Sequence, residues 1–125
     1  MILDTNALSA YADGDEGAIK RITNTSLIAI PVIVLGEYLY GISQSRQRVE
    51  YERWINGILG VSRVLEITPE TASRYGELRS ELKRAGAPIP SNDAWIAALC
   101  RQHSLPLLSK DRHFDVVKGI RRVEW

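Results

Sequence analysis

The pattern of apolar positions along the chain predicts short buried strands that alternate with helices. Four short runs rich in apolar residues are bounded by polar or turn-forming residues, as expected of strands that are covered on both faces. These runs occupy residues 1–3, 27–30, 62–67 and 105–108, and residues 122–125 form a candidate fifth strand. The strands are therefore few, short and well separated in sequence.

The longer segments between these runs carry apolar residues at helical spacing. Thr68 and Pro69 mark one helix start, with Thr68 as N-cap and Pro69 in the first turn. Its expected buried stripe consists of Ala72, Tyr75, Leu78 and Leu82. We expect Ser91 to cap the helix that follows the extended proline-containing segment. The predicted helices cover residues 7–12, 15–24, 32–42, 46–59, 69–85 and 92–103.

Strands separated by helices indicate parallel pairing through right-handed crossovers, with helices on both faces of the sheet. The predicted fold class is therefore α/β, a three-layer α/β/α sandwich with a parallel sheet of four to five strands. The chain has 125 residues, which is close to the commonest size of a domain. We expect residues 1–125 to form a single domain.

Composition narrows the function classes only a little. Hydrophobic residues make up 45% of the chain and charged residues 25%, as is ordinary for a soluble globular protein. No apolar run approaches the roughly 20 residues that span a bilayer, and Asp4 interrupts the first run too early for a secretory signal. The single cysteine, Cys100, excludes an internal disulfide and fits a reducing compartment. We therefore expect a cytoplasmic protein without a membrane partner.

Four carboxylates occupy notable positions in this pattern. Asp4 and Asp111 follow the first and fourth predicted strands, Asp93 lies in the first turn of a helix, and Glu37 lies in the most apolar helix. Each has an ordinary interpretation when taken alone. Asp4 and Asp111 could be turn or cap residues, and Asp93 could stabilise the helix dipole by about 0.3–1 kcal/mol. Glu37 could reach solvent or pair with an Arg from elsewhere in the chain.

Taken together, the four carboxylates favour a shared site. Their positions map to the same edge of a parallel sheet. Converging carboxylates repel one another, and the same stretches carry no matching cluster of Lys or Arg. A hard divalent cation relieves that repulsion, and oxygen ligands select Mg²⁺ or Mn²⁺. Such ions support hydrolysis of phosphodiester bonds by an activated water.

The motifs that contain these carboxylates resemble the PIN domain and, within it, the VapC toxin family of toxin–antitoxin systems. The resemblance covers the whole chain, and its motifs occur in the family's order. They are ILDTN at residues 2–6, Glu37 in its apolar helix, PSNDAWIAA at residues 90–98 and SKDRHF at residues 109–114. The resemblance implies a metal-dependent endoribonuclease whose acids correspond to Asp4, Glu37, Asp93 and Asp111.

The resemblance also implies supporting residues, cofactors and partners. Asn6 and Ser109 match polar residues around the family's site, and Ser109 stands where many members have Thr. We expect Asp4, Asp93 and Asp111 to bind Mg²⁺ or Mn²⁺, while Glu37 completes a second ion site or orients the attacking water. The substrate is expected to be RNA. VapC-like proteins are usually homodimers, neutralised by a small antitoxin whose C-terminal segment enters the acidic groove.

Two rival functions have weaker support. A signalling receiver domain would share the length, the parallel sheet and an acid cluster. It would need a phospho-accepting aspartate near mid-chain, yet there is none between Asp15 and Asp93. A non-catalytic PIN-like module that binds RNA or a protein has no need for the complete acid set, which is electrostatically costly.

Other polar residues favour structural interpretations. Asp115 is expected to be a solvated charge, His103 to end a helix, and Cys100 to be packed in the core. His113 is expected beside the site, where it could touch RNA or be an ordinary loop histidine. Two groups of basic residues could bind RNA phosphates, but the glutamates interleaved with them favour solvated helix faces. These groups are Arg46, Arg48 and Arg53, and separately Arg74, Arg79, Lys83 and Arg84.

Overall fold

The computed structural model describes residues 1–125 and contains one parallel sheet of five strands, in the order β3-β2-β1-β4-β5. All four neighbouring pairs are parallel. The strands are β1 (Ile2–Leu3), β2 (Ala29–Pro31), β3 (Arg63–Leu65), β4 (Leu107–Leu108) and β5 (Arg122–Val123). The candidate fifth strand is thereby confirmed.

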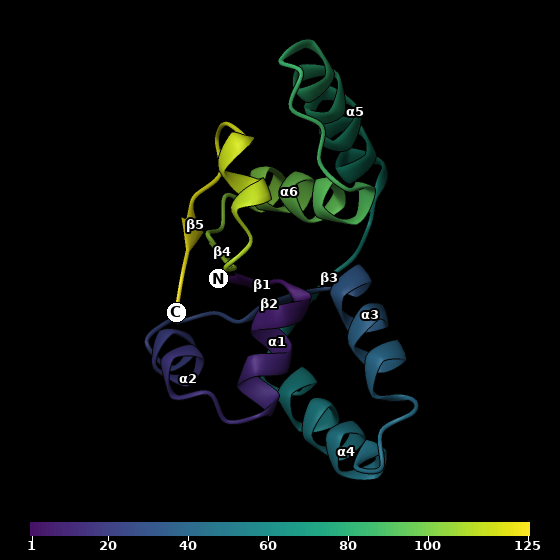
Figure 1. Ribbon diagram of the computed structural model, residues 1–125, viewed down its shortest axis with the longest axis vertical. Helices are drawn as coiled ribbons and strands as arrows, with labels where there is room; N and C mark the ends of the chain where they lie inside the picture. Colours follow the sequence, from purple (N-terminus) through teal and green to yellow (C-terminus); the bar gives the residue numbers. More distant parts are fainter.

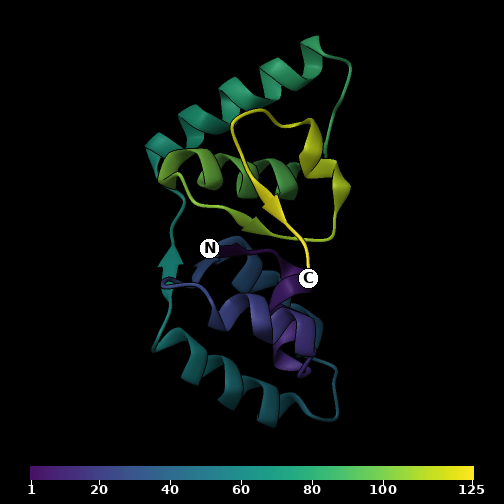
Figure 2. The same ribbon diagram turned by 90° about the vertical axis from the view of Figure 1, so that its left-hand side faces the viewer.

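Six α-helices and one 3₁₀ helix surround the sheet. They are α1 (Thr5–Ala12), α2 (Glu16–Thr23), α3 (Val32–Ile42), α4 (Arg48–Leu59), α5 (Pro69–Arg84), α6 (Ser91–His103) and the 3₁₀ helix η1 (Arg112–Val116). Figure 1 shows α5 and α6 on one side of the strands and α1 to α4 on the other, and Figure 2 shows the same division. The predicted three-layer α/β/α class is correct.

The two central strands form the most deeply buried part of the fold. Ile2 and Leu3 of β1, like Leu107 and Leu108 of β4, have no exposed surface. Leu3 pairs with Leu108, so the residues that follow them, Asp4 and Ser109, emerge side by side at the carboxyl edge of the sheet. The Asp4 amide donates to the Leu108 carbonyl over 3.3 Å, which carries the pairing one residue past β1.

The start of α5 follows the sequence pattern closely. Thr68 caps the helix and forms a reciprocal capping box with Thr71. The buried stripe differs in one place, because Thr71 is buried whereas Ala72 is exposed. Burial of Thr71 is tolerated because its hydroxyl donates to the Gln102 side chain of α6. The expectation that Ala72 faces the core was wrong.

Helix and strand boundaries need three further corrections. Pro90, not Ser91, is the N-cap of α6, and no side chain caps that helix end. The first helix begins at Thr5 because Asp4 itself supplies the cap. The third strand is shorter than residues 62–67, since only Arg63–Leu65 pairs with β2 and the following Glu66 is exposed.

No helix in the structure combines the length and apolarity required to cross a lipid bilayer.

A pair of Val→Ala substitutions tests the packing of the α1–α4 layer. Val34 of α3 has no exposed surface, whereas Val49 of α4 is 59% exposed. Both positions are helical, so the change in helix propensity is shared. Val34→Ala should lower the free energy of unfolding by about 2 kcal/mol, because it removes buried methyl groups and leaves a cavity. Val49→Ala should stay within about 0.5 kcal/mol of wild type. Urea denaturation measures both, and equal effects would contradict this packing.

Candidate metal centre

Asp4 is a buried carboxylate at the carboxyl end of β1. Only 6% of the residue is exposed, and its Oδ1 accepts a hydrogen bond of 2.8 Å from the amide of Ala7. Burial raises the pKa of Asp4 above its ordinary value, and the negative charges of Asp111 and Glu37 raise it further. Hydrogen bonds from Ser109 and Ala7 act in the opposite direction. Asp4 is thus both the cap of α1 and a member of an acid cluster.

Asp93 approaches this cluster from the first turn of α6. Its side chain is 21% exposed. Burial raises the pKa of Asp93, and the nearby charges of Asp111, Asp4 and Glu37 add to the increase. His113 acts against them. The positive end of a helix dipole normally lowers the pKa of a carboxylate there, so the raised pKa of Asp93 reflects its burial first and the neighbouring acids second.

Asp111 enters the site from the loop between β4 and η1. Its Oδ1 accepts from the amide of His113 over 2.9 Å and thereby caps η1. The His113 ring also lies in the cluster, with Nδ1 3.0 Å from Asp111 Oδ1 and 3.8 Å from Asp93 Oδ2. His113 therefore lies beside the site, as the sequence indicated, although it belongs to η1 rather than to a loop. Its position two residues after Asp111 was the available signal.

Glu37 reaches the site from α3 on the opposite side of the sheet. It is half-buried, and its Oε1 accepts a hydrogen bond of 3.2 Å from the Asn92 amide Nδ2. The partner of Glu37 is thus the neutral amide of Asn92 and not an Arg from elsewhere in the chain. Sequence reasoning missed Asn92, because 55 positions separate it from Glu37. Asn92 immediately precedes Asp93 and joins α6 to α3 at the site.

Ser109 connects two of the acids. It has no exposed surface, it hydrogen bonds to Asp4, and its Oγ accepts from the Asp111 amide over 3.0 Å. Asn6, by contrast, is exposed in the first turn of α1 and makes no side-chain hydrogen bond within the protein. Asp115 lies outside the cluster, because Arg122 Nε binds its Oδ1 at 2.7 Å.

The donor set fits a hard divalent cation. Asp93, Asp111 and His113 can each offer one ligand atom, and these atoms all lie within 4.8 Å of one another. Two oxygens bound to one Mg²⁺ at about 2.1 Å are at most about 4.2 Å apart, so this spacing needs only small side-chain adjustments. No Lys or Arg makes an ion pair with any of the clustered acids. A bound cation would therefore supply the positive charge that no Lys or Arg side chain provides to these acids.

The fold and this acid cluster define a nuclease-like α/β domain, and comparison with known proteins identifies its family. The model of the PIN domain family matches residues 1–120. The chain therefore belongs to the PIN domain family.

Its relatives within the family carry more specific names. The chain is 31% identical to ribonuclease VapC2 of Rickettsia felis, covering 99% of this chain and 96% of the relative. It is 30% identical to the tRNA(fMet)-specific endonuclease VapC of Salmonella typhimurium, covering 99% of this chain and 96% of that relative. The crystal structure of DNA-bound VapBC from Salmonella typhimurium superposes with a TM-score of 0.88 at 29% identity, covering 99% of this chain and 96% of that chain.

The raised pKa values of Asp4 and Asp93 predict how stability depends on pH without metal. A carboxylate whose pKa is raised by folding makes the native state bind more protons than the unfolded chain. Metal-free stability should therefore increase as pH falls from 7 toward about 4, the pKa of an unfolded aspartate. Asp93→Asn should then raise the melting temperature in EDTA at pH 7.

Asp115→Asn is the matched control. Hydrogen bonds from Arg122 lower the pKa of Asp115, so removal of that charge should leave stability unchanged or reduced at pH 7. Thermal unfolding in EDTA at pH 5 and pH 7 measures both variants. An Asp93→Asn protein that melts below wild type at pH 7 would show that Asp93 is mainly a helix-start residue.

Proposed function

We propose that this protein is a VapC-like endoribonuclease that hydrolyses RNA phosphodiester bonds with the help of Mg²⁺ or Mn²⁺. The observation that carries the proposal is the convergence of Asp4, Glu37, Asp93 and Asp111 at one sheet edge in a chain of the PIN domain family. The relatives named as ribonucleases and as a tRNA-specific endonuclease support RNA as the substrate class.

The proposed roles follow from position and burial. Asp4, Asp93 and Asp111 would hold the cation, because Asp93 and Asp111 offer oxygens within 4.8 Å of each other and the charge of Asp4 acts on both. When bound, a divalent cation supplies positive charge to phosphate oxygens and lowers the pKa of water. Glu37, held by Asn92, would complete a second ion site or accept a hydrogen bond from the attacking water. No protein nucleophile is required, and the products would carry 3′-hydroxyl and 5′-phosphate ends.

Two residues would serve as supports. Ser109 fixes Asp4 and Asp111 relative to each other through its hydroxyl. Asn6 is exposed beside Asp4 and has its amide free to contact a water or a phosphate. A non-catalytic binding module is the alternative function. The raised pKa values of Asp4 and Asp93 speak against it, because a module that only binds RNA gains nothing from carboxylates that repel the phosphate backbone.

The proposed partners are a cognate antitoxin and a second copy of the chain. Structures similar to this one include VapBC from Salmonella typhimurium and VapBC2 from Rickettsia felis, each bound to DNA. The acidic groove would bind a positively charged segment at the C-terminus of the antitoxin. The proposal takes residues 1–125 as one nuclease domain that acts in the cytoplasm as a homodimer.

Substitution of the acids tests the nuclease function directly. Mutation of residues that only support metal ligands costs about 10–100-fold in activity or metal affinity, so loss of a ligand should cost more. Asp4→Asn and Asp93→Asn should therefore reduce RNA cleavage in Mn²⁺ by at least about a hundredfold. Asp115→Asn, which lies outside the cluster, should cleave at the wild-type rate. The assay is gel analysis of defined RNAs with Mn²⁺ and with EDTA, and unimpaired cleavage by folded Asp93→Asn would refute the proposal.

Expression in a bacterium tests the toxin role separately. Wild-type protein expressed alone should arrest growth, and Asp4→Asn should not, because growth arrest would require RNA cleavage. Growth curves after induction, with immunoblots to confirm equal protein levels, provide the measurement. Equal effects of the two proteins on growth would contradict the toxin role while leaving the nuclease proposal to the cleavage assay.

A further inference from the structure

Two surface hollows meet beside the acid cluster. One, of about 350 Å³, is lined by Asp111 and His113 of the cluster, by Arg112 between them in sequence, and by Pro88 and Ile89. The other, of about 370 Å³, lies between α5 and the same Pro88–Ile89 segment. Pro88 and Ile89 line both hollows, so the two lie next to each other between the acids and α5.

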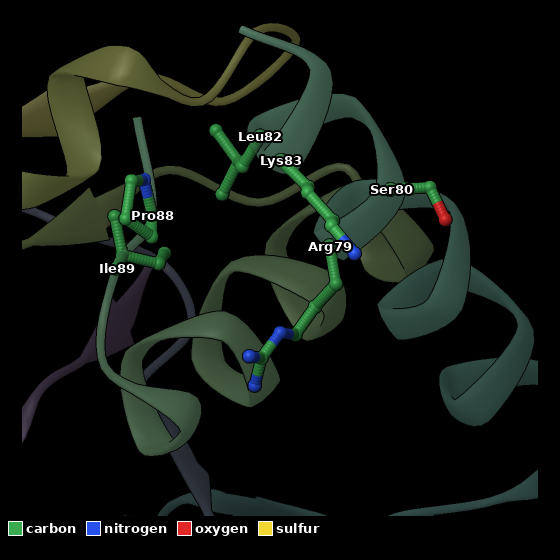
Figure 3. A pocket seen from close by; sticks show the side chains of 6 residues that line it. All are labelled: Arg79, Ser80, Leu82, Lys83, Pro88 and Ile89. Atoms are coloured by element: carbon green, nitrogen blue, oxygen red, sulfur yellow. The ribbon is translucent and has the colours of Figure 1, made fainter. Parts of the chain in front are cut away.

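The second hollow is basic. Its polar lining consists of Arg79, Ser80 and Lys83, and no carboxylate borders it. Figure 3 shows Arg79 and Lys83 extending from α5 between the Pro88–Ile89 segment and Ser80. Neither cation makes an ion pair. The hollow therefore presents two positive charges without any internal counter-ion.

The glutamates interleaved with these cations on α5 do not pair with them. Glu81 is bound by Arg101 of α6 at 2.8 Å, and Glu77 makes no ion pair. Arg79 and Lys83 are four residues apart, so they face each other across one helical turn. Like charges at this spacing destabilise a helix slightly, and a bound anion would relieve that repulsion.

The Arg79 side chain is held in place by neutral groups. Its Nη1 donates to the Tyr75 hydroxyl over 2.8 Å, and its guanidinium carbon lies 5.6 Å from the centre of the Tyr75 ring. Tyr75 in turn stacks on Trp95 of α6, with ring centres 3.8 Å apart. This support fixes the direction of the guanidinium while leaving its charge available. Trp95 is two residues from Asp93, so the arginine is anchored to the helix that carries an acid of the cluster.

We infer that the basic hollow binds the backbone phosphates of the RNA strand on one side of the scissile bond, with Arg79 and Lys83 as the binding residues. The inference rests on the proposed nuclease function and adds the path of the substrate. The acid edge repels phosphate in the absence of metal, so affinity must come from cations outside it. The remaining wall of the hollow, formed by Leu82, Pro88 and Ile89, is apolar and offers contact to a ribose or a base.

A single strand of RNA fits these features better than a protein segment. An acidic peptide could meet the two cations, but the neighbouring hollow would then place the Asp111 carboxylate beside it. RNA places phosphates at the basic end and its scissile phosphate at the end where a cation would bind.

Binding in EDTA separates this inference from catalysis. The probe is a fluorescent single-stranded RNA of about twelve nucleotides, followed by anisotropy between about 50 and 200 mM salt. Arg79→Gln and Lys83→Gln should each weaken binding and should each flatten the plot of log affinity against log salt by about 0.7, the value for one lost phosphate contact with a single strand. In Mn²⁺ the same variants should raise KM and leave kcat unchanged.

Arg53→Gln is the matched control, because Arg53 is exposed on α4, across the sheet from the hollow, and makes no ion pair. It should bind RNA with the wild-type salt dependence. Lys83→Gln should melt at or above the wild-type temperature, since it removes a like-charge contact, so a loss of binding cannot be ascribed to unfolding.

The inference is overturned if the Arg79→Gln/Lys83→Gln double variant binds RNA as tightly as wild type and with the same salt slope. It is also overturned if the double variant changes only the sedimentation of the protein, which would identify the hollow as a protein contact. A further possible result is a protein that binds RNA through Arg79 and Lys83 in a salt-dependent way and yet cleaves no RNA with any metal. That result would support RNA binding in the basic hollow and refute the nuclease function.

Discussion

The fold holds a carboxylate in a place where it cannot be solvated, and the chemistry of the site follows from that constraint. Asp4 emerges from the fully buried strand β1 with 6% of its surface exposed, and it is anchored by the Ala7 amide. It cannot turn away to water without uncapping α1. Asp93 and Asp111 are brought against it by α6 and by the end of β4, so their repulsion is built into the backbone. A bound cation would relieve this repulsion.

Arg and Lys side chains do not form ion pairs with this cluster. Arg122 is occupied by Asp115, and Arg101 by Glu81, so neither guanidinium is available to neutralise the acids. Arg79 lies on α5, where its guanidinium donates to the neutral Tyr75 hydroxyl. In this arrangement the acids can bind a metal ion and the unpaired cations can bind phosphate. A nuclease must bind both the positive metal ion and the negative phosphate.

Much of the fold could be predicted because local pattern and tertiary structure agree. Asp4 directly follows a strand that is apolar throughout, and this alone placed it at the carboxyl edge of a parallel sheet. The parts that failed depend on contacts between distant segments. Nothing near Glu37 in sequence indicates Asn92, and nothing near Thr71 indicates that Gln102 would allow its burial. The participation of His113 likewise depends on the turn into η1, which orients its ring toward Asp111.

The central claim is that the acids form a cation site, and location of the ion tests it most directly. Crystals soaked in Mn²⁺ and measured near the manganese absorption edge would show any bound ion by its anomalous scattering. The account predicts a peak among the carboxylates of Asp4, Asp93 and Asp111 that is absent from crystals of Asp93→Asn treated in the same way. A wild-type map with no peak at these residues, at a Mn²⁺ concentration that supports RNA cleavage, would contradict it.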